Sequence, residues 1–119
     1  MDPTVSRPGD GERFERSNRT ITIRSDLPQV SILEIEFDDT FVVDPHVHAD
    51  HADSFYVLEG EVEFTVGDDT VRAGPGTVVS VPPGARHGFC GVEGTARVLN
   101  FHTPEMGFTA FIRGAQAAS

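Results

Sequence analysis

Residues 46–60 read HVHADHADSFYVLEG, and they place three histidines and two aspartates within eight residues before an apolar run that ends at Gly60. The 119-residue chain contains five histidines, so this enrichment is local. Side chains two residues apart on a β-strand point to the same face, and His46 and His48 can therefore direct two imidazoles at one metal ion. Asp53 begins the inner row of the following strand, so its carboxylate can reach the same ion.

A second stretch, residues 76–87, reads GTVVSVPPGARH and supplies a further ligand. An apolar strand runs into a Pro-Pro-Gly turn at residues 82–84, and His87 follows three residues after the glycine. Proline fixes φ and glycine permits positive φ, so this turn can reverse the chain sharply. We therefore expect His87 to be aimed at a fixed place rather than left in a loose loop.

Together, the two stretches resemble the paired motifs of the cupin family. The first motif has the spacing His-x-His-x4-Asp-x6-Gly at His46, His48, Asp53 and Gly60. The second has the spacing Gly-x5-Pro-x-Gly-x2-His at Gly76, Pro82, Gly84 and His87. The chain departs from the family pattern at three positions: Thr40 replaces the first glycine, Asp53 the usual glutamate and Gly91 the usual asparagine.

The resemblance implies an all-β, single-domain jelly-roll β-barrel of two antiparallel sheets with a metal site in its mouth. It implies the ligand set His46, His48, Asp53 and His87, although a water-facing Asp53 is the alternative for that residue. Imidazole and carboxylate ligands suit one divalent transition metal per chain, among Fe, Mn, Ni, Cu and Zn. Open positions on such a metal suit oxygen chemistry or Lewis-acid catalysis.

Short segments rich in β-branched and aromatic residues alternate with Gly, Pro and Asp turns, which favours a sandwich or barrel. Strands are predicted at residues 21–23, 30–37, 41–43, 55–58, 62–66, 70–72, 77–81 and 96–102. Residues 108–112 are predicted as a last strand, with a short helix as the alternative. We expect a flexible N-terminal arm over residues 1–19 (or an edge extension), the barrel domain over 20–113, and a C-terminal tail over 114–119.

His102 is the candidate catalytic residue. In some small cupins that act on sugar acids, a late strand supplies an acid/base side chain to the cavity, and the resemblance gives His102 this role. A structural role is the alternative, because strand parity does not decide whether Asn100 and His102 face inwards. We interpret Asp50 and His51 as solvated loop residues, with a contact at the mouth of the site as the alternative for His51.

The composition of the chain limits the classes of partner that we expect it to bind. A net charge of −10 disfavours nucleic acids and anionic membranes, which require a basic surface. The single cysteine, Cys90, excludes an intrachain disulfide and suits the cytoplasm, and no apolar run is long enough to span a membrane. We expect a homodimer, because Tyr56 and Leu58 form an apolar outward row.

The preferred function is therefore a metal-dependent enzyme that acts on a small organic molecule, with dioxygenase-type or related metal-assisted chemistry. The apolar interior favours an aromatic or enol substrate over a sugar. One alternative is a Lewis-acid isomerase similar to the cupins that act on sugars and uronates. The other is a non-catalytic module that binds a small ligand.

Overall fold

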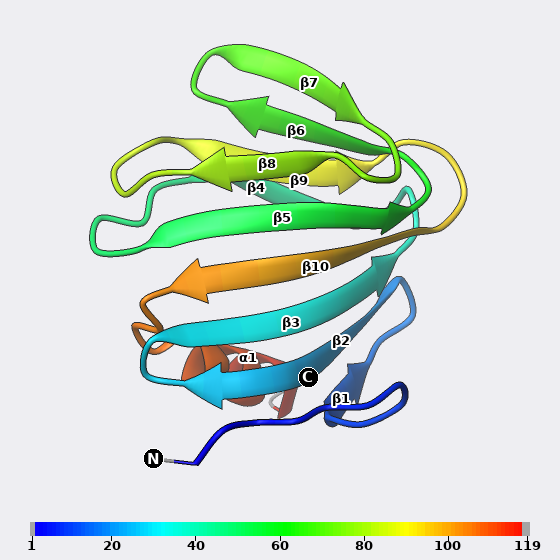
Figure 1. The fold of residues 1–119 in the computed structure, drawn as a ribbon. Coiled ribbons are helices and arrows are strands. Elements are labelled where there is room, and N and C mark those ends of the chain that lie inside the picture. Colours follow the sequence, from blue (N-terminus) through cyan, green and yellow to red (C-terminus); the bar gives the residue numbers. More distant parts are fainter. Residues whose placement is uncertain (1, 118–119) are drawn as a thin grey trace.

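The computed structural model describes residues 2–117 and folds most of them into two antiparallel sheets (Figure 1). One sheet has the strand order β1-β2-β3-β10-β5-β8 and the other has the order β4-β9-β6-β7. The elements are β1 (Glu12–Glu15), β2 (Arg19–Leu27), β3 (Val30–Phe37), β4 (Val42–His46), β5 (Ala52–Glu59), β6 (Val62–Val66), β7 (Asp69–Ala73), β8 (Val78–Val81), β9 (His87–Gly91), β10 (Ala96–Thr103) and α1 (Phe108–Ala117). This arrangement confirms the predicted all-β jelly roll.

Alternation along the central strands explains why the two sheets pack together. In β5, Asp53, Phe55 and Val57 are buried, whereas Tyr56 between them is exposed. β3 and β10 alternate in the same way, and their buried faces meet the inner face of β6 and β9. A sheet with one buried face requires this period of two residues.

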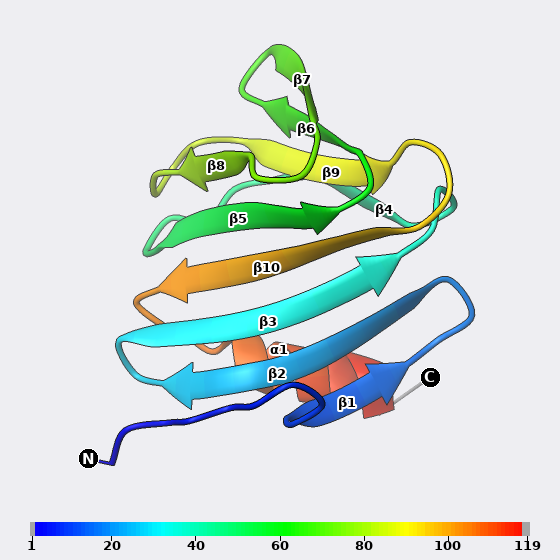
Figure 2. The same ribbon diagram turned by 45° about the vertical axis from the view of Figure 1, so that its right-hand side comes forward.

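The C-terminal segment closes the open side of the barrel. The expectation of a strand over 108–112 is wrong, because α1 forms there; the alternative of a short helix is correct. Figures 1 and 2 show α1 behind β2 and β3, on the same side of the six-stranded sheet as the other sheet. Ile112 joins the core and Arg113 pairs with Glu12 and Asp26, so both apolar and charged contacts hold the helix in place.

The N-terminal segment also differs from a free arm. Within residues 1–19, β1 pairs with β2 as an edge extension of the six-stranded sheet, and Arg24 donates hydrogen bonds to the backbone oxygens of Ser6 and Arg7. Of the predicted tail 114–119, residues 118 and 119 lie outside the described part of the chain. No helix in the described part has the length and apolar character needed to cross a membrane.

Candidate metal centre

Strand pairing brings the two motifs together at one end of the barrel. β4 pairs with β9 so that His46 lies directly opposite His87. His48 lies beyond the end of β4, not on the strand as expected, but Gly84 donates its backbone N–H to the His48 oxygen at 2.8 Å. Gly84 has a φ of 85°, which a residue with a Cβ adopts only with strain. The turn of the second motif thus holds the histidine loop of the first.

The ligand atoms of the four predicted metal ligands lie close together. The Nε2 atoms of His46 and His48 lie 3.0 Å apart, and Nε2 of His87 lies 2.8 Å from Oδ2 of Asp53. Nε2 of His48 lies 3.6 Å from the same carboxylate oxygen. Two ligand atoms at right angles, each about 2.1 Å from one metal, lie about 3 Å apart. The spacing therefore fits a single metal ion.

The opposite nitrogens of two of these imidazoles are fixed by the backbone. His46 Nδ1 donates to the Asp44 oxygen at 2.8 Å, and His87 Nδ1 donates to the Ala85 oxygen at 3.0 Å. A neutral imidazole has one N–H, so Nε2 of each ring then carries a lone pair. The His87 lone pair faces a carboxylate oxygen, and either a proton or a metal cation has to lie between these two acceptors. Backbone support of this kind is typical of metal-binding histidines.

The electrostatics of the cluster agree with a site for a cation. Burial opposes charge on Asp53, but hydrogen bonds from His87 and Asn100 and the nearby His102 outweigh it and lower the pKa of Asp53. Burial likewise opposes charge on His87, yet its hydrogen bonds to Asp53 and Ala85 raise its pKa. For His48, burial and the neighbouring imidazoles lower the pKa against the attraction of Asp53. The carboxylate thus stays ionised while the ring of His48 stays neutral.

Asn100 is a site residue that the sequence analysis did not identify. Its Nδ2 donates to Asp53 Oδ1 at 2.6 Å and to the Ser54 backbone oxygen at 3.1 Å, while Oδ2 of Asp53 stays directed at the histidines. Asn100 is 3% exposed and shares the inner face of β10 with His102. The sequence does show that Asn100 and His102 are two residues apart and share one face of a strand. This identifies Asn100 as a site residue only when the buried face of β10 is known.

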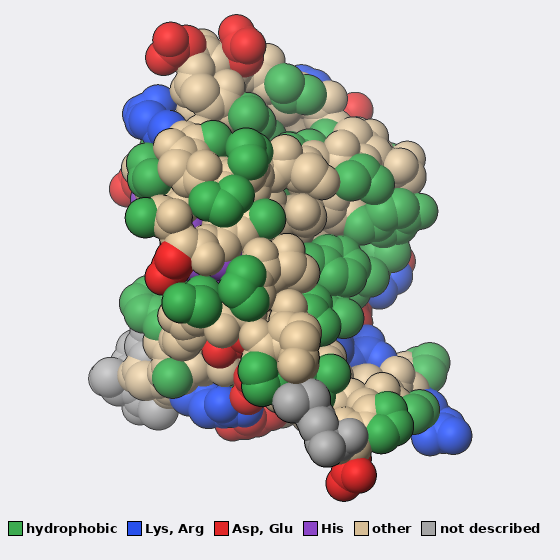
Figure 3. Space-filling view, turned by 60° about the vertical axis from the view of Figure 1, so that its left-hand side comes forward, with side chains coloured by type: hydrophobic (Ala, Val, Ile, Leu, Met, Phe, Trp, Pro, Cys, Tyr) green, Lys and Arg blue, Asp and Glu red, His purple; other side chains and the backbone are tan. Residues whose placement is uncertain are grey.

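His102 faces the interior. The expectation that His51 is a solvated loop residue is wrong, because its ring is buried. The two rings are 1% and 5% exposed, and His102 Nδ1 lies 2.8 Å from His51 Nε2. Phe108 of α1 stacks on His102 with the ring centroids 3.9 Å apart. Burial lowers the pKa of His102 to about 4. Figure 3 accordingly shows only small patches of histidine on its side of the molecule.

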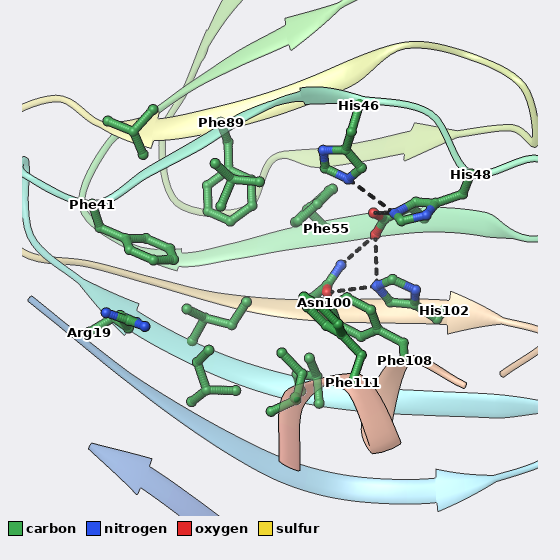
Figure 4. Close-up of a pocket in the computed structure, with 17 residues that line it drawn as sticks. Arg19, Phe41, His46, His48, Phe55, Phe89, Asn100, His102, Phe108 and Phe111 are labelled. Carbon is green, nitrogen blue, oxygen red and sulfur yellow. Dashed lines mark hydrogen bonds and ion pairs between the residues drawn. The ribbon is translucent and has the colours of Figure 1, made fainter. Parts of the chain in front are cut away.

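A cavity of about 460 Å³ extends from this cluster into the barrel. In Figure 4, the polar side chains of His46, His48, Asn100 and His102 gather at one end. Apolar side chains line the remainder: Ile21, Leu33, Ile35, Phe41, Val42, Val43, Phe55, Phe89, Phe108, Phe111 and Ile112. Arg19 lies at the other end, with its guanidinium carbon 5.4 Å from the centre of the Phe41 ring.

A jelly roll with three histidines and a carboxylate inside its mouth defines a class of barrel proteins with a candidate metal site. The family model described as the cupin domain matches residues 34–102, more than half of the chain. The chain belongs to the cupin family. No curated protein sequence matches it significantly.

Solved structures agree in fold. An RmlC-like cupin from Shewanella frigidimarina has a TM-score of 0.80 at 19% identity, covering 91% of this chain and 96% of that one. KdgF from Halomonas sp. has a TM-score of 0.76 at 22% identity, covering 82% and 92%. Pac13, described as a nucleoside dehydratase, has a TM-score of 0.71 at 16% identity, covering 91% and 88%. A structure of Streptomyces Pac13 contains uridine.

Proposed function

We propose that this cupin is a metal-dependent enzyme that acts on a small, largely apolar organic molecule with oxygen atoms at one end. The convergence of His46, His48, His87 and Asp53 at one end of an apolar cavity carries the proposal. When bound, a divalent transition metal (Fe, Mn, Ni, Cu or Zn) would supply Lewis acidity and, for a redox-active metal, a means of activating O₂. Dioxygenase-type chemistry is the first reaction class that we propose.

The distribution of polar groups supports an aromatic or enol substrate. Hydroxyl groups along the body of a sugar would meet Leu33, Phe55 and Phe89, none of which accepts or donates a hydrogen bond. Each buried polar group left without a partner costs about 1–3 kcal/mol. A substrate with its oxygen atoms confined to the histidine end avoids this cost, because its apolar body lies against apolar side chains.

His102 is the residue that we propose as an acid/base group. It lines the cavity, and its Nε2 lies 3.5 Å from Oδ1 of Asp53, so the ring borders the ligand cluster. A neutral imidazole, which burial favours here, can accept a proton at one nitrogen while it donates at the other. This property favours the second candidate, a Lewis-acid isomerase, in which protons move between neighbouring atoms of the substrate.

The test uses protein produced without a His tag in metal-replete medium. We expect about one metal equivalent per chain by elemental analysis, and metal-dependent O₂ uptake with members of a panel of aromatic and enol compounds. Turnover of sugars or uronates without O₂ uptake would favour the isomerase. Ligand binding without turnover in either panel would favour the non-catalytic module, and less than about a tenth of a metal equivalent would exclude the metal-dependent proposal.

We also propose that the protein is a cytoplasmic homodimer. Tyr56 on the outward row of β5 is 39% exposed, and its partner Val78 on the edge strand β8 is 61% exposed. An apolar sheet face beside an unpaired edge favours pairing with a second copy. Light scattering at micromolar concentration should give the dimer mass, and a monomer mass would contradict the proposal.

A further inference from the structure

Arg19 places a positive charge at the end of the cavity opposite the histidines. It is the first residue of β2 and alternates with the buried Ile21 and Ile23, so its side chain starts on the inner face of the sheet. Figure 4 shows its guanidinium beside Phe41, with 5.4 Å between the guanidinium carbon and the ring centre. Among the described residues that line the cavity, Arg19 is the single arginine or lysine. A small molecule that fills the cavity therefore meets a fixed cation at this end.

The register of β3 shows how far Arg19 lies from the histidines. Ser31, near the start of β3, pairs with His102. Phe37, at the end of β3, pairs with Arg19 and lies about 20 Å further along the strand, at roughly 3.3 Å per residue. The long side chain of Arg19 shortens this gap, but Leu33 on the inner face of β3 still lies between the two levels and lines the cavity. A ligand held at both ends therefore needs an apolar body between its polar groups.

A carboxylate is the polar group that suits the Arg19 end of the cavity. A guanidinium presents its N–H donors in a planar fork that matches the two oxygens of a carboxylate. Nη1 of Arg19 also donates to Oδ1 of Asn18 at 3.2 Å, and this neutral partner leaves the charge of the guanidinium in place. At the histidine end, Asp53 already contributes a carboxylate, and the net charge of −10 gives the chain no general attraction for anions. Arg19 is therefore the group that would attract an anion into the cavity.

We propose that Arg19 is a specificity-determining residue that binds a carboxylate of the substrate, at the far side of an apolar body from the oxygen atoms at the histidine end. The substrate class is then an aromatic or enol acid whose carboxylate is remote from the reacting oxygen atoms. Such a carboxylate has a partner, so it avoids the cost that excludes hydroxyl groups along the middle of the cavity. The inference rests on the proposed function, since it concerns the substrate of the same cavity, but the carboxylate site can be measured without metal or turnover.

The experiment compares two probes, 4-phenylbutyrate and 4-phenylbutyramide, by NMR titration of the chelator-treated protein. The probes have nearly the same shape, but only the first carries a charge. Wild type should bind the acid about tenfold more tightly than the amide, because a hydrogen bond between two charged groups is stronger than one to a neutral group. Nuclear Overhauser contacts should place the CH₂ group next to the carboxylate against the ring of Phe41.

Variants separate the charge of Arg19 from its place in the fold. Arg19→Gln should lower the affinity for the acid about tenfold and change the affinity for the amide less than about threefold. Arg19→Lys keeps the charge but loses the planar fork, so its affinity for the acid should lie between those of wild type and Arg19→Gln. Arg72→Gln is the matched control, because it removes one positive charge from a side chain on β7 that is 60% exposed and does not line the cavity. It should bind the acid within about twofold of wild type, since solvent and salt screen a distant surface charge.

Four results would overturn the inference. They are binding of neither probe at millimolar concentration, equal affinity of wild type for acid and amide, contacts of the carboxylate end with His46 and His48 in place of Phe41, and an unchanged preference for the acid in folded Arg19→Gln. The last result is expected if Arg19 only supports the fold beside Glu36 and Asp38, which line a hollow on its other side.

The test does not depend on one variant or on metal binding. If Arg19→Gln does not fold, the preference and the contacts of wild type still decide. Wild type that binds no metal but prefers the acid through Arg19 would contradict only the metal-dependent function. Wild type that binds metal but does not distinguish the two probes would contradict only the inference about Arg19.

Discussion

The histidines at and beside the polar end of the cavity fall into two groups that are held in different ways. His46 and His87 are each anchored at Nδ1 by a backbone oxygen two residues earlier in the chain. His51 and His102 are anchored by side chains, and their contact joins distant parts of the sequence. A backbone oxygen is an acceptor of fixed position, whereas a side-chain partner can be replaced, rotated or protonated.

This difference separates two chemical tasks within one cavity. The backbone-anchored rings present Nε2 lone pairs in a fixed direction, as a metal requires. The side-chain-anchored rings form a chain of groups that can each carry a proton in more than one place, as acid/base chemistry requires. The predictions below test this separation, beginning with the largest expected effect.

Removal of the proposed histidine ligands, which are the backbone-anchored His46 and His87 together with His48, should have the largest effect on metal affinity. We expect the His46→Ala/His48→Ala double variant and His87→Ala each to lose more than about 100-fold in affinity, because direct ligands contribute more than the 10–100-fold typical of their supporting partners. A chelator competition titration with Zn²⁺ or Co²⁺ measures the loss.

His102→Ala provides the comparison within the same cavity. It should retain metal affinity within about tenfold of wild type, since His102 borders Asp53 without being assigned as a ligand. Once a substrate is known, this variant should show reduced turnover. Full metal retention in the double variant would contradict the division into two groups, as would equal losses in His102→Ala and His87→Ala.

The pH dependence of the free energy of unfolding should distinguish the two groups in the chelator-treated protein, because His102 and His87 contribute to it with opposite signs. Burial lowers the pKa of His102 from 6.5 to about 4, so between these values the unfolded chain binds a proton that the folded protein excludes. Stability from this residue is therefore lost as the pH falls from 6.5 towards 4, by about 3 kcal/mol in total. Despite burial, contacts with Asp53 and Ala85 raise the pKa of His87, so its contribution is lost as the pH rises through the folded-state value.

Urea unfolding at several pH values measures both contributions. His102→Gln should lose about 3 kcal/mol less stability than wild type between pH 7 and pH 4, because glutamine does not titrate. His87→Gln should show the reverse change, with less loss of stability than wild type as the pH rises. Parallel stability curves for wild type and both variants would contradict the prediction, because they would show that neither imidazole changes its pKa on folding.

The same contrast explains how much could be predicted from the sequence. The residues 46–60 and 76–87 carry local spacing, and local spacing was sufficient for the barrel and for the proposed ligand residues, which the structure brings together. The strand 30–37 was predicted with the bounds that the structure shows. By contrast, buried His51 contacts His102, and no spacing within one segment predicts a contact between segments so far apart.

Two further differences have the same physical origin. Residues 87–91 form β9, but His-Gly-Phe-Cys-Gly has weak strand propensity, and its pairing with β4 and β6 compensates. The composition of residues 108–112 favours a strand, although Phe108, Phe111 and Ile112 have the three- and four-residue spacing of the helix that forms there. Tertiary contacts determine the secondary structure of both segments, because each is too short for its local sequence to favour one type clearly.

Asp53 should show the smallest effect on metal affinity among the proposed ligands. Its Oδ1 is held by Asn100 at 2.6 Å, so one oxygen, Oδ2, faces the histidines. Aspartate is one methylene shorter than the usual glutamate of the family, and water can occupy the vacated position after truncation. We expect Asp53→Ala to lose about tenfold in affinity, clearly less than His87→Ala, because three neutral imidazoles remain.

The loss of the carboxylate should nevertheless alter reactivity, since removal of an anionic ligand makes a bound metal more electron-poor and its bound water more acidic. Asp53→Asn is the matched control, because it retains the shape and a hydrogen-bonding oxygen for Asn100 while it removes the charge. Chelator competition on Asp53→Ala, Asp53→Asn and His87→Ala gives the order of affinities. If Asp53→Ala loses as much metal affinity as His87→Ala, the carboxylate contributes as much to metal binding as a histidine. The side chains would then divide into four metal ligands on one side and the pair His51 and His102 on the other.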